Sequence, residues 1–203
     1  MTYWRGLRDW QQAGVWEKLH LMLLDKPGDV GKIDWSRAAV DSASIAAKRG
    51  GSTGPSPTNN GKPGTERHIM VDAKGVPLAV ICTVANVPDS NALTDMTDAV
   101  KPIKKPKVIG RGRRKRPTKL HADKGHDFER CRRALRSRGI APPIARLGVE
   151  GSKKLGKHRW VVECTLAWLS QLRRLVIRYE RGLDIHRAFL HLGCALLCWN
   201  YLK

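Results

Sequence analysis

An amphipathic helix predicted over residues 158–178 is the feature that most constrains how this chain can fold. At 100° per residue, one side of this helix collects apolar side chains, while Arg159, Glu163 and Arg174 fall on the other side. A helix with one apolar face is stable when that face packs on other elements. We therefore expect a core beneath the helix and Glu163 pointing away from it. The apolar stripe consists of Val161, Thr165, Trp168, Leu169, Leu172, Leu175 and Val176.

The rest of the chain alternates between short strand patterns and helical patterns. Helices are expected at residues 4–24 with a break at Gly14, and at 89–100, 127–138 and 184–202, with a turn at 26–29. Strands are expected at 37–41, 68–71, 77–84, 118–123 and 140–144. The turn-like residues 72–75 join the second and third of these strands into a hairpin. Strands mixed with helices predict one α/β domain.

The charge of the chain points to a polyanionic partner. There are 38 Lys and Arg residues against 18 Asp and Glu residues, a formal net charge of +20. Nucleic acid is the first partner that such a balance indicates, and an anionic membrane surface is the second. The sequence has no apolar run of about 18 residues and no signal segment, so we expect a cytoplasmic, nucleoid-associated protein that does not enter a membrane. Five cysteines without a CxxC pair favour neither a disulfide framework nor a structural zinc site.

A basic, Pro- and Gly-rich loop at residues 101–119 is the best candidate for contact with DNA phosphates. Such blocks hold DNA by releasing counterions and do not read base sequence. A solvated loop with no ligand is the alternative. The residues expected to bind DNA are Lys104, Lys105, Lys107, Arg111, Arg113, Arg114, Lys115 and Arg116 in this loop, with Arg173 and Arg174 further along the chain.

Three acids have the arrangement that metal-dependent phosphoryl transfer requires. Asp41 and Asp123 each close a short predicted strand, and Glu163 lies on the polar face of the helix; the separations are 82 and 40 residues. Carboxylates about 4 Å apart repel by several kcal/mol, so a cluster of them needs cations or protons. Mg²⁺ suits this role, and two such ions could activate the attacking oxygen and stabilise the leaving one. Taken singly, each Asp could be a turn former and Glu163 a solvated ion-pair partner.

Several segments resemble the transposases of the fifth major group of insertion sequences. The segments are 33–44, 72–79, 121–125 and 159–169, and the similarity continues to the C-terminus. The resemblance implies a ribonuclease-H-like mixed sheet flanked by helices, with Asp41, Asp123 and Glu163 as a DDE triad that binds two Mg²⁺ or Mn²⁺ ions. Arg159 matches the arginine one turn before the glutamate of this family. The implied partner is double-stranded DNA, both inverted-repeat ends and target, bound by a homo-oligomer.

The chain also departs from that family in several places. Gly156 and Ser170 stand where the wider signature has Tyr and Lys, and His126 stands where many relatives carry Tyr. Such transposases usually begin with a further helical DNA-binding portion. We therefore expect residues 1–30 to be a remnant of that portion and residues 31–203 to be the DDE catalytic domain, with a second reading-frame product as a possible completing partner.

Three functions remain open at the level of sequence. The first is an enzyme that cleaves DNA at insertion-sequence ends and transfers the strands. The second is a catalytically idle, truncated DNA-binding remnant, which the short N-terminal portion favours. The third is a structural RNA-binding protein, which the charge alone would equally suggest. The presence of all three acids in their expected local settings argues against the third function and modestly against the second.

Overall fold

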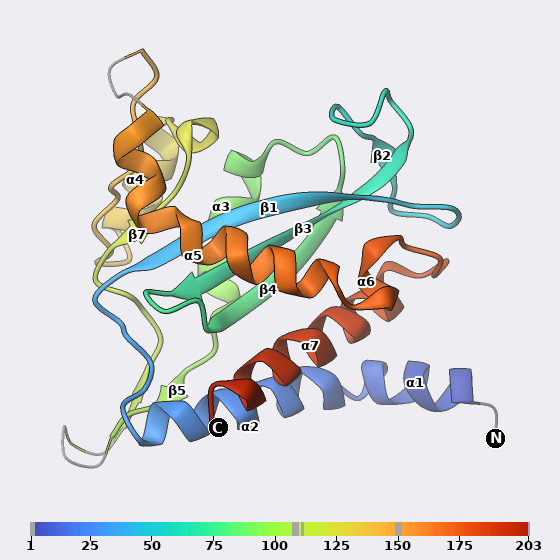
Figure 1. Ribbon diagram of the computed structural model, residues 1–203, viewed down its shortest axis with the longest axis horizontal. Coiled ribbons are helices and arrows are strands. Elements are labelled where there is room, and N and C mark those ends of the chain that lie inside the picture. Colours follow the sequence, from blue (N-terminus) through green and yellow to red (C-terminus); the bar gives the residue numbers. More distant parts are fainter. Residues whose placement is uncertain (1–2, 107–109, 111, 149–151, 203) are drawn as a thin grey trace.

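A five-stranded mixed sheet forms the centre of the molecule, with helices on both of its faces (Figure 1). The computed structural model describes residues 3–106, 110, 112–148 and 152–202. The central strand β1 pairs antiparallel with β3 and parallel with β7, and β3 also pairs with β2 and β4. This arrangement confirms the predicted mixed α/β sheet flanked by helices. The strands are β1 (Ala38–Ala46), β2 (Gly54–Pro55), β3 (Pro63–Asp72), β4 (Pro77–Val84) and β7 (Leu120–His121).

Two hydrophobic cores lie on the two faces of the sheet. Neighbouring residues of a strand point to opposite faces, so Val40 enters the core under α3 and α4, whereas Ala39 enters the core under α5 and α7. In Figure 1, α5 crosses the second face in front of β1. The helices are α1 (Tyr3–Gln12), α2 (Val15–Asp29), α3 (Asp89–Ala99), α4 (Glu129–Arg136), α5 (Ser152–Ser170), α6 (Arg173–Val176) and α7 (Leu183–Asn200).

The first two helices lie along α7 at the bottom of Figure 1. Their predicted break is confirmed at Gly14, which has a positive φ of 68°. The predicted turn at residues 26–29 is wrong, because α2 continues through Pro27 to Asp29. A Cβ on Gly28 would lie 2.5 Å from the carbonyl oxygen of Lys104, so the glycine serves close packing here and does not end the helix.

The hairpin between β3 and β4 is confirmed, and its turn helps to hold α5. Buried Asp72 accepts backbone N–H hydrogen bonds from Asp34, Lys74 and Val76 at 2.8–2.9 Å. The hydroxyl of Thr165 in α5 donates to the carbonyl of Gly75 at 2.9 Å. The hydrogen bond to this turn therefore helps to position α5 against the sheet.

Two other predicted elements are shorter than expected. The strand at residues 140–144 is reduced to isolated parallel bridges, from Ala141 to Lys119 and from Ile144 to Ala122. The helix at 158–178 ends at Ser170, and α6 follows as a separate turn. Trp168 and Val176, which the wheel placed in the apolar stripe, are 43% and 51% exposed.

The basic loop contains a short antiparallel ribbon beside α2. It consists of β5 (Ile103–Lys104) and β6 (Arg113–Arg114) and lies at the lower left of Figure 1. Among the residues that the structure describes, no helix is long and apolar enough to cross a membrane.

Candidate active site

Asp41 lies on β1, and Asp123 follows the neighbouring parallel strand β7. The pairs Ala38–Leu120 and Ala39–His121 are each 82 positions apart in the sequence, as are Asp41 and Asp123. Adjacent strands lie about 4.8 Å apart, so this register brings the two aspartates to one place. The strand predicted at 118–123 is shorter in the structure, so Asp123 lies two residues after the end of β7. The prediction that Asp41 ends its strand is also wrong. β1 continues to Ala46 because its whole length pairs with β3.

Asp41 lies under α5 and is paired with a cation from it. Its Oδ2 atom accepts a hydrogen bond from Arg159 Nη2 at 2.9 Å, and its Oδ1 atom accepts one from the backbone N–H of Ser42 at 2.9 Å. Burial raises the pKa of the Asp41 carboxyl above its ordinary value, and the charge of Arg159 counteracts that rise. The negative charge of Asp123 raises the pKa of Asp41 further.

Asp123 is hydrogen-bonded to His126, a residue that was not assigned to the site from the sequence. His126 Nδ1 lies 2.5 Å from Asp123 Oδ1, and the His126 side chain is buried. This hydrogen bond is the main cause that lowers the pKa of Asp123, with a further contribution from the charge of Arg159. The available signal was a histidine three residues after the aspartate, separated from it by Lys124 and Gly125.

Glu163 lies on the same face of α5 as Arg159, one turn later. It is exposed, whereas Val161, Thr165 and Leu169 on the opposite side are buried, so the helical wheel was right for this residue. Over the described ranges no group of three His, Cys, Asp or Glu side chains is arranged to hold a metal ion. The structure therefore brings together Asp41, Asp123 and Arg159, while Glu163 remains outside a metal-binding group.

The two interacting aspartates are nevertheless a suitable donor set for a hard divalent cation. Carboxylate oxygens are the ligands that Mg²⁺ takes, and Mg²⁺ needs few of them. The charge of Asp123 raises the pKa of Asp41, so a cation between the two would be stabilised. Arg159 already supplies one positive charge at this position.

A second acidic group lies on the other side of β1. The hydroxyl of Ser42 is 3.0 Å from Glu66 Oε1 and 2.9 Å from Asp89 Oδ2. His68, also buried, contacts Thr83 Oγ1 at 2.8 Å and lies 3.6 Å from Asp89. Burial raises the pKa of Glu66, and the charge of Asp89 adds to that rise. These side chains support the strand that carries Asp41.

The residues predicted to bind DNA are spread over two parts of the molecule. In the ribbon, Arg113 pairs with Asp25 at 2.9 Å and Arg114 lies over the ring of Trp35 at 5.6 Å. These contacts fasten the ribbon to the body of the protein, and Arg116 adds a hydrogen bond to the backbone. Arg173 and Arg174 are exposed in α6, at the other side of Figure 1. Lys104 is exposed, and Lys105 and Lys115 are half-buried. Lys107 and Arg111 lie outside the described residues.

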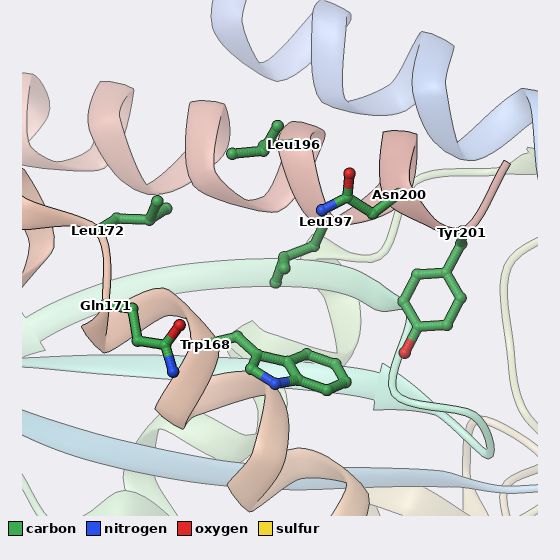
Figure 2. Close-up of a pocket in the computed structure, with 7 residues that line it drawn as sticks. All are labelled: Trp168, Gln171, Leu172, Leu196, Leu197, Asn200 and Tyr201. Carbon is green, nitrogen blue, oxygen red and sulfur yellow. The ribbon is translucent and has the colours of Figure 1, made fainter. Parts of the chain in front are cut away.

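A groove between the end of α5 and the end of α7 is separate from the acids (Figure 2). Its volume is about 420 Å³, and Trp168 forms one wall, which accounts for the exposure of this side chain. None of the predicted catalytic or DNA-binding residues lines it. The lining residues are Trp168, Gln171, Leu172, Leu196, Leu197, Asn200 and Tyr201.

The sequence matches known proteins over most of its length. It is 53% identical over 155 residues to the protein assigned as the transposase of insertion sequence element IS402 from Burkholderia cepacia, covering 74% of this chain and 70% of that protein. It is also 62% identical over 47 residues to an uncharacterized 16.2 kDa protein of the same element and organism, covering 23% of this chain and 32% of that protein.

The similarity to solved structures is weaker. A chain of the simian T-cell lymphotropic virus intasome, in complex with PP2A regulatory subunit B56 gamma, aligns with a TM-score of 0.46 and 14% identity. The alignment covers 77% of this chain and 48% of that one. The family model described as the transposase DDE domain matches residues 28–199. The chain therefore belongs to the transposase DDE domain family, whose enzymes cleave DNA and transfer its strands.

Proposed function

We propose that this chain cleaves DNA at insertion-sequence ends and transfers the strands, with Asp41, Asp123 and Glu163 as its catalytic acids. The observation that carries the proposal is the register of β1 and β7, which places Asp41 beside Asp123 with Arg159 paired to one of them. Two strand-borne carboxylates under a basic helix are suited to phosphoryl transfer. Glu163, one turn from Arg159, would supply the third carboxylate.

Asp41 and Asp123 would hold the Mg²⁺ or Mn²⁺ ions, and Glu163 would have to move to join them; two such ions would activate the attacking oxygen and stabilise the leaving oxygen. The residues of the chain itself have other tasks. Arg159 orients the carboxylate of Asp41 and offsets part of its buried charge. Because Arg159 is only 14% exposed, its charge acts on Asp41 with little screening by solvent.

The proposed partner is double-stranded DNA, bound through the basic side chains on the ribbon and on α6. The net charge of +20 supports this choice, and binding through phosphates would weaken steeply with salt. A homo-oligomer on the two DNA ends, association with the nucleoid and a completing second reading-frame product are further predictions. So is the division into an N-terminal remnant (1–30) and a catalytic domain (31–203).

The first prediction concerns nicking of supercoiled plasmid, and of a duplex with an insertion-sequence end, in Mg²⁺ or Mn²⁺. The parent protein should nick both substrates, and Asp123→Asn should reduce nicking to background because it removes a charged ligand. Asp95→Asn is the matched control, since Asp95 is exposed on α3; this variant should match the parent. Equal nicking by Asp123→Asn and the parent would refute the assignment of Asp123. A parent with no activity would instead favour an idle remnant.

A further inference from the structure

We propose that His126 is a positioning residue that fixes the carboxylate of Asp123 for metal binding. This inference rests on the proposed function, because it assumes that Asp123 is a metal ligand. His126 is absent from the acid triad and stands where many relatives carry Tyr. Its assignment comes from the geometry of the turn after β7.

The turn that follows β7 folds His126 back onto Asp123. Residues 124–126 form a 3₁₀ turn, and the backbone N–H of His126 donates to the carbonyl of Asp123 at 3.1 Å. This closes the loop and places the imidazole Nδ1 atom 2.5 Å from Asp123 Oδ1. A Cβ on Gly125 would lie 3.2 Å from the same oxygen, so glycine at this position leaves the carboxylate uncrowded.

Burial holds the ring of His126 in this orientation. The side chain is 4% exposed, while that of Asp123 is 36% exposed. Beyond the ring lies a small space lined by side chains from β1, β3 and α3. The imidazole is therefore wedged between α3 and the site, and the accessible part of the Asp123 carboxylate faces away from it.

The chemistry of the pair sets the direction of the hydrogen bond. An ionised carboxylate only accepts hydrogen bonds, so Nδ1 of His126 must carry the hydrogen. The bond restrains Oδ1, while the Asp123 side chain remains 36% exposed and so accessible to an ion. Groups that hydrogen-bond a metal-ligating side chain in this way contribute about 10- to 100-fold in metal affinity or activity.

The test measures Mn²⁺ affinity of the full chain by electron paramagnetic resonance of the free ion. His126→Ala should weaken Mn²⁺ binding by about 10- to 100-fold. His126→Asn should restore most of the affinity, because the Asn Nδ2 atom occupies nearly the place of Nδ1. His126→Gln, whose amide reaches further, should not restore it. The control is His121→Asn: His121 packs on the ring of His158 at 4.9 Å and has no part in the proposal. This control should bind Mn²⁺ like the parent.

A second measurement does not depend on metal or on folding of the variants. ¹⁵N NMR of the metal-free parent should show His126 protonated at Nδ1. A hydrogen on Nε2 alone would overturn the proposal, as would unchanged Mn²⁺ affinity in His126→Ala. Failure of the proposed function is a different result: in that case Asp123→Asn itself would bind Mn²⁺ and nick DNA as the parent does.

Discussion

Arg159 is the residue that links the polar face of α5 to the sheet. Its ion pair with Asp41 is mostly buried, with side-chain exposures of 14% and 21%. Removing one partner of such a pair leaves the other as an uncompensated charge, which is costly. The helical wheel could place Arg159 and Glu163 on one face, but it could not show that Arg159 reaches across to β1.

We predict that Arg159→Ala loses activity and changes its pH dependence. Arg159 counteracts the rise in the pKa of Asp41, so without it that pKa rises further. If ionised Asp41 is required, the acid limb of the nicking profile moves to higher pH. Arg159→Lys keeps the charge and should retain part of the activity with a smaller displacement of the limb. The control is Arg136→Gln on the exposed surface of α4, which should leave the profile unchanged. An Arg159→Ala profile that coincides with the parent profile would contradict this role.

Two other arginines, Arg67 and Arg178, have structural roles that the amino-acid composition does not reveal. Arg178 is fully buried and donates to backbone carbonyls of residues 51, 52, 180 and 181 and to Thr65. Arg67 is also buried and donates to the carbonyl of Leu175 at 3.1 Å. Both are included in the formal net charge of +20. Each in fact ties the α6 region to β3, and only tertiary contacts could reveal this.

At the scale of single elements, α5 was predictable where its periodicity persists. The wheel correctly buried Val161, Thr165 and Leu169 and exposed Glu163. It failed at Val176, because the helix stops at Ser170 and the chain turns before α6, and at Trp168, which lines the groove between α5 and α7. A wheel assumes one continuous axis, so residues near an unrecognised break are assigned to the wrong side.

β1 extends further than predicted, whereas α5 ends earlier than predicted. The strand was predicted at residues 37–41, ending on Asp41. Pairing with β3 extends it to Ala46 regardless. Nevertheless the parallel register with β7 preserves the predicted meeting of Asp41 and Asp123. Convergence of these acids was thus predictable from spacing and resemblance, whereas the position of Asp41 within its strand depended on a partner strand.

We predict opposite effects on stability for two helical glycines: Gly193, which is packed against α5 and α6, and Gly156, which is exposed in α5. A Cβ on Gly193 in α7 would lie 2.9–3.0 Å from side chains of Leu169, Leu172 and Leu175. Gly193→Val should therefore lower the free energy of unfolding by roughly 1–3 kcal/mol through overpacking. Gly156→Ala in α5 meets nothing within 4 Å and should raise it by about 0.5–1 kcal/mol. Urea denaturation measures both; a stabilising Gly193→Val would contradict the packing described for α7.

For the molecule as a whole, charge and mixed element types were sufficient to predict an α/β domain suited to DNA. They were insufficient to place the basic residues. The ribbon and α6 lie at different sides of Figure 1, and several predicted DNA contacts instead fasten the ribbon to α2 and Trp35. The distribution of positive charge depends on tertiary folding, so the path of DNA across the surface was not accessible from sequence.

Histidines with lowered pKa values lie in several parts of the molecule and make its stability sensitive to acid. Burial lowers the pKa of His20 to about 3 and those of His68, His121 and His191 to about 4. In the unfolded chain these groups titrate near 6.5. A lowered pKa means that the folded state binds fewer protons than the unfolded state between these values. The stability contributed by a neutral imidazole is thus fully present above pH 6.5 and is lost as the pH falls toward 4.

We predict that His20→Gln makes unfolding less sensitive to acid. His20 Nε2 lies 2.8 Å from the carbonyl of Pro77, and its ring packs on His191 at 5.7 Å between ring centres, where α2 meets α7. The Gln amide can keep the hydrogen bond without titrating. Within the window each such histidine contributes about 1.4 kcal/mol per pH unit, so the slope of unfolding free energy between pH 6 and 4.5 should decrease by about that amount. Urea denaturation of metal-free protein measures the slope. At pH 8 the two proteins should differ little, because both hold neutral side chains there; identical slopes in acid would mean that His20 is protonated in the folded state.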